Sequence, residues 1–307
     1  MRIAIMAAGA VGGYFGARLV QAGHDVVFIA RGKHLDALRK DGLKIESLLG
    51  DAHLTNVNAT DDPKVVGPVD IVMFAVKLWH TESAGEQTKP LVGPDTRVIT
   101  LQNGVDSVER LAPILGADHV VGGTTHVVTV MAAPGLIRHT SKFATFRCGF
   151  PDKRKDAKLQ AFVDAAQKAG IDAILSDDIA RDRWQKFVLL TGTSGATASM
   201  RSTLGPIVND PDTRAFFRKI MEETFAVARA KGIRLAEDYV DQQMAFADAA
   251  LPTMKASQFN DLEAGNRLEL DWLAGKVVAL GRELGVPTPA NEAVYAILKL
   301  HRMGRRD

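Results

Sequence analysis

Apolar positions follow two different patterns along the chain, and the change comes close to residue 178. Before it, short apolar runs without a polar period predict strands that are buried on both faces of a sheet. An amphipathic stretch before the last of these runs predicts a helix. Such buried strands are predicted at 2–6, 69–76 and 97–101, with a second strand at 24–29, a closing strand at 171–175 and the helix at 156–169.

Two further segments predict antiparallel pairing. A turn signal at Gly50-Asp51 separates short apolar stretches at 44–45 and 53–54, which predicts a small edge hairpin. Turn signals at Pro134-Gly135 and at Ser141-Lys142 then predict a three-strand meander added to the sheet. The strands of this meander are expected at 127–130, 136–139 and 143–146.

After residue 178 the pattern becomes helical, and no strand pattern returns. Stops at Gly232, Pro252, Gly285 and Pro287 separate the predicted helices. A mainly parallel α/β domain at 1–176 is therefore expected before an all-helical domain at 177–307, with the active site in the cleft between them. The helices are predicted at 183–202, 211–231, 237–249, 261–284 and 288–303.

The first thirty-one residues form a strand, a glycine-rich turn, a helix and a second strand. Such a unit resembles the dinucleotide-binding fingerprint, in which glycines let the backbone approach a pyrophosphate at a helix N-terminus. Here the pattern reads A-x-G-x-x-G, with Ala7 in place of the first glycine and with Gly9 and Gly12 retained. Nucleotide binding is favoured over a purely structural turn, so we predict a Rossmann-type N-terminal domain.

Ala7 has two possible consequences for this turn. An alanine fits if its φ stays negative, and it is strained if the turn requires a positive φ. From the sequence we expect the turn to tolerate Ala7 without strain.

Arg31 ends the second strand and indicates which cofactor binds. An acidic residue at this place bonds the ribose hydroxyls of NAD, whereas an arginine accommodates the 2′-phosphate of NADP. Arg31 lies nineteen residues after Gly12, where this residue is expected. The alternative is a solvated basic loop, but the position favours NADP(H).

Composition narrows the classes of function. The chain has 307 residues, of which 46% are hydrophobic and 24% charged, and this is typical of a globular protein with two domains. A net charge of +2 gives no reason to expect binding to nucleic acid or a membrane. A single cysteine, Cys148, and no signal-like or membrane-spanning run predict a cytoplasmic protein. No metal-binding pattern is expected.

Polar residues at the ends of two predicted strands are candidates for the cofactor site. Lys77 follows the strand at 69–76, and Asn103-Gly104 follows the strand at 97–101. Open α/β sheets bind ligands at the carboxyl ends of their strands. An exposed strand end and a plain turn are the alternatives, and the shared position favours a functional role for both.

Lys186 lies inside an apolar helical segment, where an unpaired ammonium is costly to bury. It either extends its head into water or acts as a paired, desolvated general acid. Gly192 and Gly195 weaken the same helix, which suggests close approach by a nicotinamide or by another helix. Glu269, within the predicted helix at 261–284, is expected to share a face with neighbouring small and apolar residues and to point into a cleft.

Taken together, the motifs resemble the ketopantoate reductase (2-dehydropantoate 2-reductase) family over nearly the whole chain. The family reduces a 2-oxo acid with NADPH on the pantothenate pathway. The residues that carry the resemblance are Gly9-Ala10-Val11-Gly12-Gly13-Tyr14-Phe15-Gly16, Ala30-Arg31-Gly32, Ala75-Val76-Lys77, Gln102-Asn103-Gly104, Trp184-Gln185-Lys186, Ser257 with Asp261, and Arg267 to Asp271.

The resemblance implies a role for each site residue. Lys186 is the catalytic lysine and Glu269 is its carboxylate partner, while Val128 lies near the cofactor through its backbone and Ser257 contacts the carboxylate end of the substrate. The cofactor-binding residues are then Ala7, Ala8, Gly9, Ala10, Val11, Gly12, Arg31, Lys77, Asn103, Val128 and Glu269. The substrate-binding residues are Asn103, Lys186, Ser194 and Ser257.

The chain departs from the family at two substrate positions. Asparagines usually stand four and eight residues after the catalytic lysine, but here the positions hold Leu190 and Ser194. Since leucine supplies no hydrogen bond, the substrate could be another 2-oxo acid, a ketone or an imine. A non-catalytic NADP(H) sensor is a third option, against which the retained Lys186 and Glu269 argue. A small-molecule substrate is expected as partner, and a homodimer is one option for assembly.

Overall fold

The computed structural model describes residues 1–305, which form two compact units. The first unit is Met1–Asp182, and the second begins at Arg183. The division lies within the helix α6 (Ile179–Met200), close to the change of pattern near residue 178.

One ten-stranded sheet organises the first unit, in the order β4-β3-β9-β8-β7-β6-β1-β2-β5, with β10 paired to β9. The pairs are parallel except for β3 with β4 and β8 with β9. The strands are β1 (Arg2–Met6), β2 (Asp25–Ile29), β3 (Leu43–Ser47), β4 (Ala52–Leu54), β5 (Ala59–Thr60), β6 (Ile71–Phe74), β7 (Arg97–Thr100), β8 (Val120–Ala133), β9 (Leu136–Gly149) and β10 (Asp172–Leu175).

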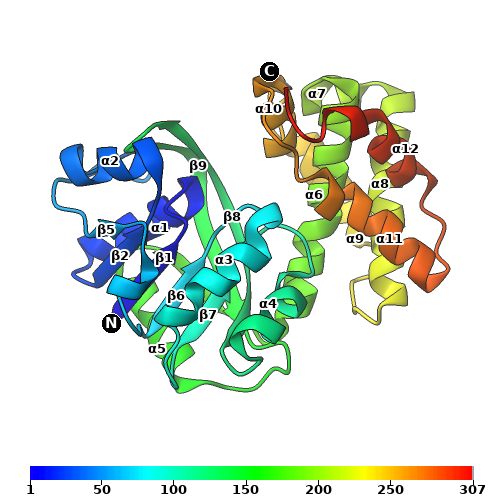
Figure 1. Ribbon diagram of the computed structural model, residues 1–307. Helices are drawn as coiled ribbons and strands as arrows, with labels where there is room; N and C mark the ends of the chain where they lie inside the picture. Colours follow the sequence, from blue (N-terminus) through cyan, green and yellow to red (C-terminus); the bar gives the residue numbers. More distant parts are fainter. Residues whose placement is uncertain (306–307) are drawn as a thin grey trace. The chain divides into compact units, whose positions relative to one another are not determined.

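Helices cover both faces of this sheet (Figure 1). Helices α1, α2 and α5 pack on one face, and α3 and α4 pack on the other. The helices of the first unit are α1 (Ala10–Gln21), α2 (Gly32–Asp41), α3 (Thr81–Thr88), α4 (Ser107–Leu115) and α5 (Ala157–Lys168), with short 3-10 turns η1 (Pro63–Val65), η2 (Leu78–His80) and η3 (Lys89–Leu91).

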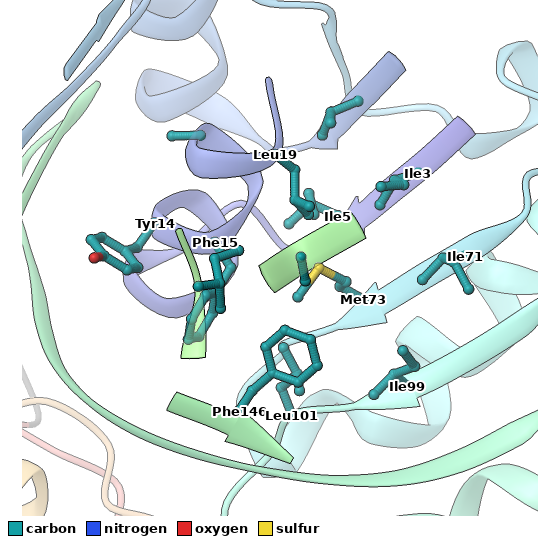
Figure 2. Packing of buried hydrophobic residues seen from close by; sticks show 14 of the residues in the cluster. Ile3, Ile5, Tyr14, Phe15, Leu19, Ile71, Met73, Ile99, Leu101 and Phe146 are labelled. Carbon is teal, nitrogen blue, oxygen red and sulfur yellow. The ribbon is translucent and has the colours of Figure 1, made fainter. Parts of the chain in front are cut away.

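Strand β1 shows why its sequence lacks a polar period. Ile3 and Ile5 point to one face of the sheet and pack with Phe15 of α1 (Figure 2). Ala4 and Met6 alternate with them and join the apolar cluster on the other face. Because side chains alternate along a strand, a strand covered on both sides must be apolar at every position. The predictions of buried strands and of the edge hairpin are confirmed.

The predicted three-strand meander is wrong, because the chain forms a single long hairpin of β8 and β9. Pro134-Gly135 makes the turn between the two strands, but Ser141-Lys142 does not turn the chain. Val127 pairs with Ala144 and Thr129 pairs with His139, so β9 carries extra residues that bulge out. The polar pair that predicted a turn lies in this bulge.

Helices alone make up the second unit over its described residues. They confirm the all-helical prediction and include α7, which the sequence pattern did not predict. Besides the part of α6 from Arg183 on, the unit contains α7 (Leu204–Asn209), α8 (Pro211–Ala230), α9 (Tyr239–Ala249), α10 (Ser257–Ala264), α11 (Ala274–Leu284) and α12 (Pro289–Leu298), with η4 (Leu270–Trp272) and η5 (Lys299–His301).

The single helix expected at 261–284 is wrong, because Gly265 ends α10. Gly265 adopts φ 71° in the left-handed region, and the N–H of Asn266 donates to the Asp261 carbonyl at 2.8 Å. This arrangement is typical of a helix C-terminus that closes on a glycine. Glu269 therefore does not lie on a continuous helix face with Gly265 and Leu273, but directly precedes η4.

The two glycines of α6 serve helix packing. A Cβ atom at Gly192 would lie 2.5 Å from Cγ of Met221 in α8. One at Gly195 would lie 3.3 Å from Val294 in α12 and 3.4 Å from Ile220 in α8. Of the two interpretations that the sequence left open, close approach by other helices accounts for both glycines. Within residues 1–305, no helix is both long enough and apolar enough to cross a membrane.

Candidate functional site

The glycine turn places uncapped backbone donors at the N-terminus of α1. Gly9 is the N-cap residue, no side chain caps the helix, and no acidic residue lies in its first turn. The first N–H groups of a helix have no partner within the helix, and the helix dipole makes this end attractive to anions. A Cβ atom added at Gly9 would meet no atom within 4 Å, so the turn is open at this position.

Gly12 lies where α1 comes closest to the sheet. A Cβ atom here would lie 2.5 Å from the Ala7 carbonyl oxygen and 2.8 Å from Ile5. Only glycine allows the helix to pack this closely on β1. The two retained glycines thus differ in role, since Gly9 leaves space at the turn and Gly12 permits packing.

Ala7 has a backbone that favours glycine. Its φ is 71°, in the left-handed region that costs an L-residue roughly 1–2 kcal/mol. The expectation that Ala7 sits in an unstrained turn is therefore wrong. The turn keeps the conformation of the glycine-containing fingerprint even though an alanine stands in it.

Residues after three neighbouring strands meet at one edge of the sheet. Strands β1, β6 and β7 are adjacent and parallel, with Met6 beside Phe74 and Phe74 beside Thr100. Ala7, Lys77 and Asn103, which follow these strands, therefore lie along the same edge. The amide of Gln102 links the loops by donating to the Val76 carbonyl at 3.1 Å and to Thr81 at 2.8 Å. The Lys77 ammonium lies 5.6 Å from the centre of the Trp79 ring.

Arg31 precedes α2 at the end of β2, and its side chain is exposed. Its guanidinium donates to the side-chain oxygen of Gln87 in α3. Val128, on the β8–β9 hairpin, is 48% exposed, and its N–H donates to Ser141 Oγ at 3.1 Å.

Lys186 and Glu269 interact electrostatically within the helical unit. Lys186 keeps part of its surface exposed but lies on α6 between the buried side chains of Trp184 and Phe187. Burial disfavours the ammonium and lowers the pKa of Lys186 from 10.5 to about 8, while the negative charge of Glu269 partly opposes this change. Glu269 is 6% exposed and lies eighty-three residues further along the chain. The fold thus brings an amine with a lowered pKa close to a buried carboxylate.

A second polar group lies along the same face of α6. Leu190 and Ser194 follow Lys186 by one and two helical turns, and Ser194 is fully buried. The side-chain amide nitrogen of Gln258 in α10 lies 3.5 Å from the Ser194 carbonyl. Ser194 Oγ and Gln258 Oε1 are buried without a hydrogen-bond partner among residues 1–305. Ser257, at the start of α10, is exposed.

Two residues near these sites were missed by sequence reasoning. Gln258 directly follows Ser257 in a mostly polar stretch, so no local pattern distinguishes it from its neighbours. His34 lies three residues after Arg31, and it contacts the backbone of the glycine turn through its ring. The part of the chain that the structure describes contains no group of three or more His, Cys, Asp or Glu residues placed to hold a metal ion.

Comparison with known proteins assigns the chain to a family. Residues 3–150 match the family described as ketopantoate reductase PanE/ApbA, and residues 178–302 match the C-terminal domain of the same family. The chain belongs to the ketopantoate reductase family. This confirms the resemblance drawn from the motifs, the Rossmann-type first domain followed by a helical one, and the oxidoreductase class.

Relatives match the chain over nearly its full length. A 2-dehydropantoate 2-reductase of Mesorhizobium japonicum is 33% identical and is aligned over 97% of both chains. The crystal structure of a PanE/ApbA family ketopantoate reductase from Ralstonia eutropha has a TM-score of 0.90 at 34% identity and covers 98% of both chains. A 2-dehydropantoate 2-reductase structure from Geobacter metallireducens has a TM-score of 0.92 at 32% identity, covering 98% of this chain and 99% of that one.

Proposed function

We propose that this protein reduces a 2-oxo acid to a 2-hydroxy acid with NADPH. The best single candidate is the reduction of 2-dehydropantoate to pantoate, a step of pantothenate biosynthesis in the cytoplasm. The observation that carries the proposal is Lys186, whose pKa is lowered to about 8 by burial and whose charge interacts with that of Glu269. Family membership and the names of the relatives support the reaction class.

The glycine turn fits a dinucleotide cofactor. The uncapped N-terminus of α1 and the open position at Gly9 suit a pyrophosphate. We assign Ala7 to Gly12 to the pyrophosphate and Arg31 to the 2′-phosphate. Lys77, Asn103, Val128 and Glu269 complete the proposed cofactor-binding set. A bound nicotinamide would supply the hydride for the carbonyl carbon.

Lys186 is the proposed proton donor to the carbonyl oxygen of the substrate. A general acid works best when its pKa lies near the working pH, and a pKa of about 8 meets this requirement where an ordinary lysine would not. Glu269 favours the charged ammonium and orients it, so that the proton is present when the substrate binds. Both residues are proposed as catalytic on this basis.

Asn103, Lys186, Ser194 and Ser257 are the proposed substrate-binding residues. Ser194 offers a buried hydroxyl, whereas Leu190 offers no polar group where the family has an asparagine. This difference supports a second candidate function, the reduction of another 2-oxo acid, a ketone or an imine. A site that hydrogen-bonds a substrate hydroxyl rejects analogues that lack it, so loss of the amide relaxes that requirement.

The test is the rate of NADPH oxidation with a panel of 2-oxo acids, ketones and cyclic imines. We expect the highest kcat/KM with a 2-oxo acid, and 2-dehydropantoate is the first to try. A higher kcat/KM with a ketone or imine would support the second candidate. Tight NADPH binding without turnover of any member would instead identify a non-catalytic sensor. Sedimentation of the same sample would test whether the protein forms a homodimer.

A further inference from the structure

His34 connects the glycine turn to the tip of the β8–β9 hairpin. It lies in the first turn of α2, and its imidazole contacts two backbone groups from distant parts of the first unit. Its Nε2 lies 2.7 Å from the Ala8 carbonyl oxygen, and the N–H of Gly135 donates to its Nδ1 at 3.0 Å.

The two contacts decide which ring nitrogen carries the proton. A backbone N–H can only donate, so Nδ1, which receives the N–H of Gly135, must be unprotonated. The proton is then on Nε2, which donates to the Ala8 carbonyl. Burial lowers the pKa of His34 below its usual value of 6.5, which keeps the ring neutral and this arrangement intact.

The hairpin end of this connection is itself held firmly. Gly135 has φ 75°, and its carbonyl accepts the N–H of Lys44 at 2.8 Å. A Cβ atom at Gly135 would lie 3.2 Å from the Cβ of Ala37 and from the Gly42 carbonyl oxygen. The hairpin tip therefore packs closely on α2 and provides a fixed support for the imidazole.

At the other end of the connection, hydrogen bonds hold two successive peptides of the turn, 7–8 through the N–H of Ala8 and 8–9 through its carbonyl. The N–H of Ala8 donates to the Ile29 carbonyl at 2.9 Å, and its carbonyl accepts from His34. Because the 8–9 peptide is trans and planar, the N–H of Gly9 points away from the side on which His34 binds the carbonyl. A hydrogen bond to a carbonyl also polarises the N–H of the same peptide and makes it a better donor.

We propose that His34 is a positioning residue for the cofactor: by holding the Ala8 carbonyl, it orients the Gly9 N–H toward the pyrophosphate of the dinucleotide. This inference rests on the proposed function, since it requires that the glycine turn bind NADPH. It also gives a reason why the turn keeps its shape around Ala7, because neighbouring contacts must hold a residue in a strained conformation.

The test compares three substitutions of His34 by their dissociation constants for NADPH. His34→Gln keeps a donor that reaches as far as Nε2, His34→Asn keeps an acceptor near Nδ1, and His34→Ala keeps neither. We expect His34→Ala and His34→Asn to weaken NADPH binding about tenfold, the loss of one hydrogen bond. His34→Gln should restore binding to within about threefold, and kcat at saturating NADPH should change little in all three.

His53→Ala is the matched control. His53 also binds the backbone of α2, through the Asp41 carbonyl at 3.1 Å, but at the end of the helix far from the turn. Its loss should leave the dissociation constant of NADPH unchanged. Urea unfolding of each variant separates local positioning from general loss of stability. If His34→Ala does not fold, the dissociation constants of His34→Gln and His34→Asn for NADPH still test whether a donor to the Ala8 carbonyl is needed.

Three results would overturn the inference. The first is a His34→Gln variant that binds NADPH as weakly as His34→Asn. The second is an NADPH affinity that changes only in proportion to the stability of each variant, and the third is unchanged NADPH binding in every variant. A parent protein that binds neither NADPH nor NADH would instead overturn the proposed function, and the inference with it.

Discussion

Ala7 is an alanine in a backbone conformation that favours glycine. Its φ of 71° is one that glycine adopts freely and alanine does not. The turn is held by its neighbours, since the N–H of Ala8 donates to Ile29 and Gly12 packs against the Ala7 carbonyl. The strain is therefore stored at the place where the proposed cofactor binds.

Replacing Ala7 by glycine should stabilise the protein by about 1 kcal/mol. Relief of the left-handed strain, roughly 1–2 kcal/mol, exceeds the added entropy of the unfolded chain, roughly 0.4–1 kcal/mol. Urea unfolding without ligand measures the difference. Ala10→Gly, at the first residue of α1 where φ is not in the left-handed region, is the control and should not stabilise the protein. A loss of stability in Ala7→Gly would show that the turn holds alanine without strain.

Lys186 should make kcat depend on pH, with kcat falling as the pH rises through about 8. Since its pKa is about 8, the ammonium is lost as the pH rises through this value, and kcat for carbonyl reduction should fall above it. Glu269→Gln removes the negative charge that raises this pKa, so the fall in kcat should move to lower pH. The measurement is the pH dependence of kcat with saturating NADPH and substrate.

The same pair should behave as one unit in a double-mutant cycle. Lys186→Ala should lower kcat by about 10²–10⁴ and spare NADPH binding. The double variant Lys186→Ala, Glu269→Ala should be little worse than the worse single variant, because Glu269 acts through Lys186. Losses that multiply would reject the coupling, and near-normal turnover in Lys186→Ala would reject the catalytic assignment.

Arg31 should set the preference for NADPH over NADH. Arg31→Ala should weaken NADPH binding roughly ten- to a hundredfold, the value of a charge-assisted hydrogen bond, and leave NADH binding nearly unchanged. Lys33→Ala removes a nearby positive charge and serves as control. Titration of each variant with both cofactors is the measurement, and an equal loss for NADH and NADPH would mean that Arg31 is structural.

At the scale of elements, α6 carries the proposed acid on a helix that packs tightly against α8. The contacts of Gly192 and Gly195 differ, and the difference gives a test of this packing. Gly192 faces Met221 with no room for a methyl group, whereas a methyl group at Gly195 would require Val294 to move by only a few tenths of an ångström.

Gly192→Ala should therefore destabilise the protein by about 1–3 kcal/mol, because the added carbon overpacks the interface with α8. Gly195→Ala is the matched control and should be nearly neutral, since the gain in helix propensity, up to about 1 kcal/mol, offsets a small shift of its neighbours. Thermal or urea unfolding measures both. Equal effects would show that the interface adapts to either methyl group.

At the scale of the whole molecule, neutral histidines connect stability to pH. Burial lowers the pKa of His34 and of His139 below 6.5, and His139 is only 2% exposed. The unfolded chain therefore binds protons first as the pH falls below 6.5, which favours unfolding. This part of the stability is complete above pH 6.5 and is lost as the pH falls toward the lowered pKa values.

The free energy of unfolding should thus fall more steeply between pH 6.5 and 5.5 than between 7.5 and 6.5. Each proton that the unfolded chain binds in excess contributes a slope of about 1.4 kcal/mol per pH unit. Urea unfolding at the three pH values is the measurement. His34→Gln removes one of the groups that only the unfolded chain protonates, so the slope between pH 6.5 and 5.5 should become less steep. A profile that is flat below pH 6.5 would contradict the assignment of neutral rings.

Local patterns determined most of the elements and the chemistry expected of single residues. The strand β1 and the helix α5 follow from apolar spacing, because the spacing records which side chains a covered strand or an amphipathic helix must bury. The glycine fingerprint followed from its place between a strand and a helix. An apolar stretch around Lys186 was enough to suggest an unusual ammonium, since burial of a charge is costly wherever it occurs.

Only the tertiary structure decided how distant or ambiguous segments combine. Ser141-Lys142 looks like a turn, but cross-strand pairing in the hairpin makes it a bulge. Gly265 could continue or end a helix, and its left-handed conformation ends it, so that Glu269 is buried just before η4 rather than on a helix face. The approach of Glu269 to Lys186 and of His34 to Ala8 depends on contacts between segments far apart in sequence, and a local pattern carries no information about such partners.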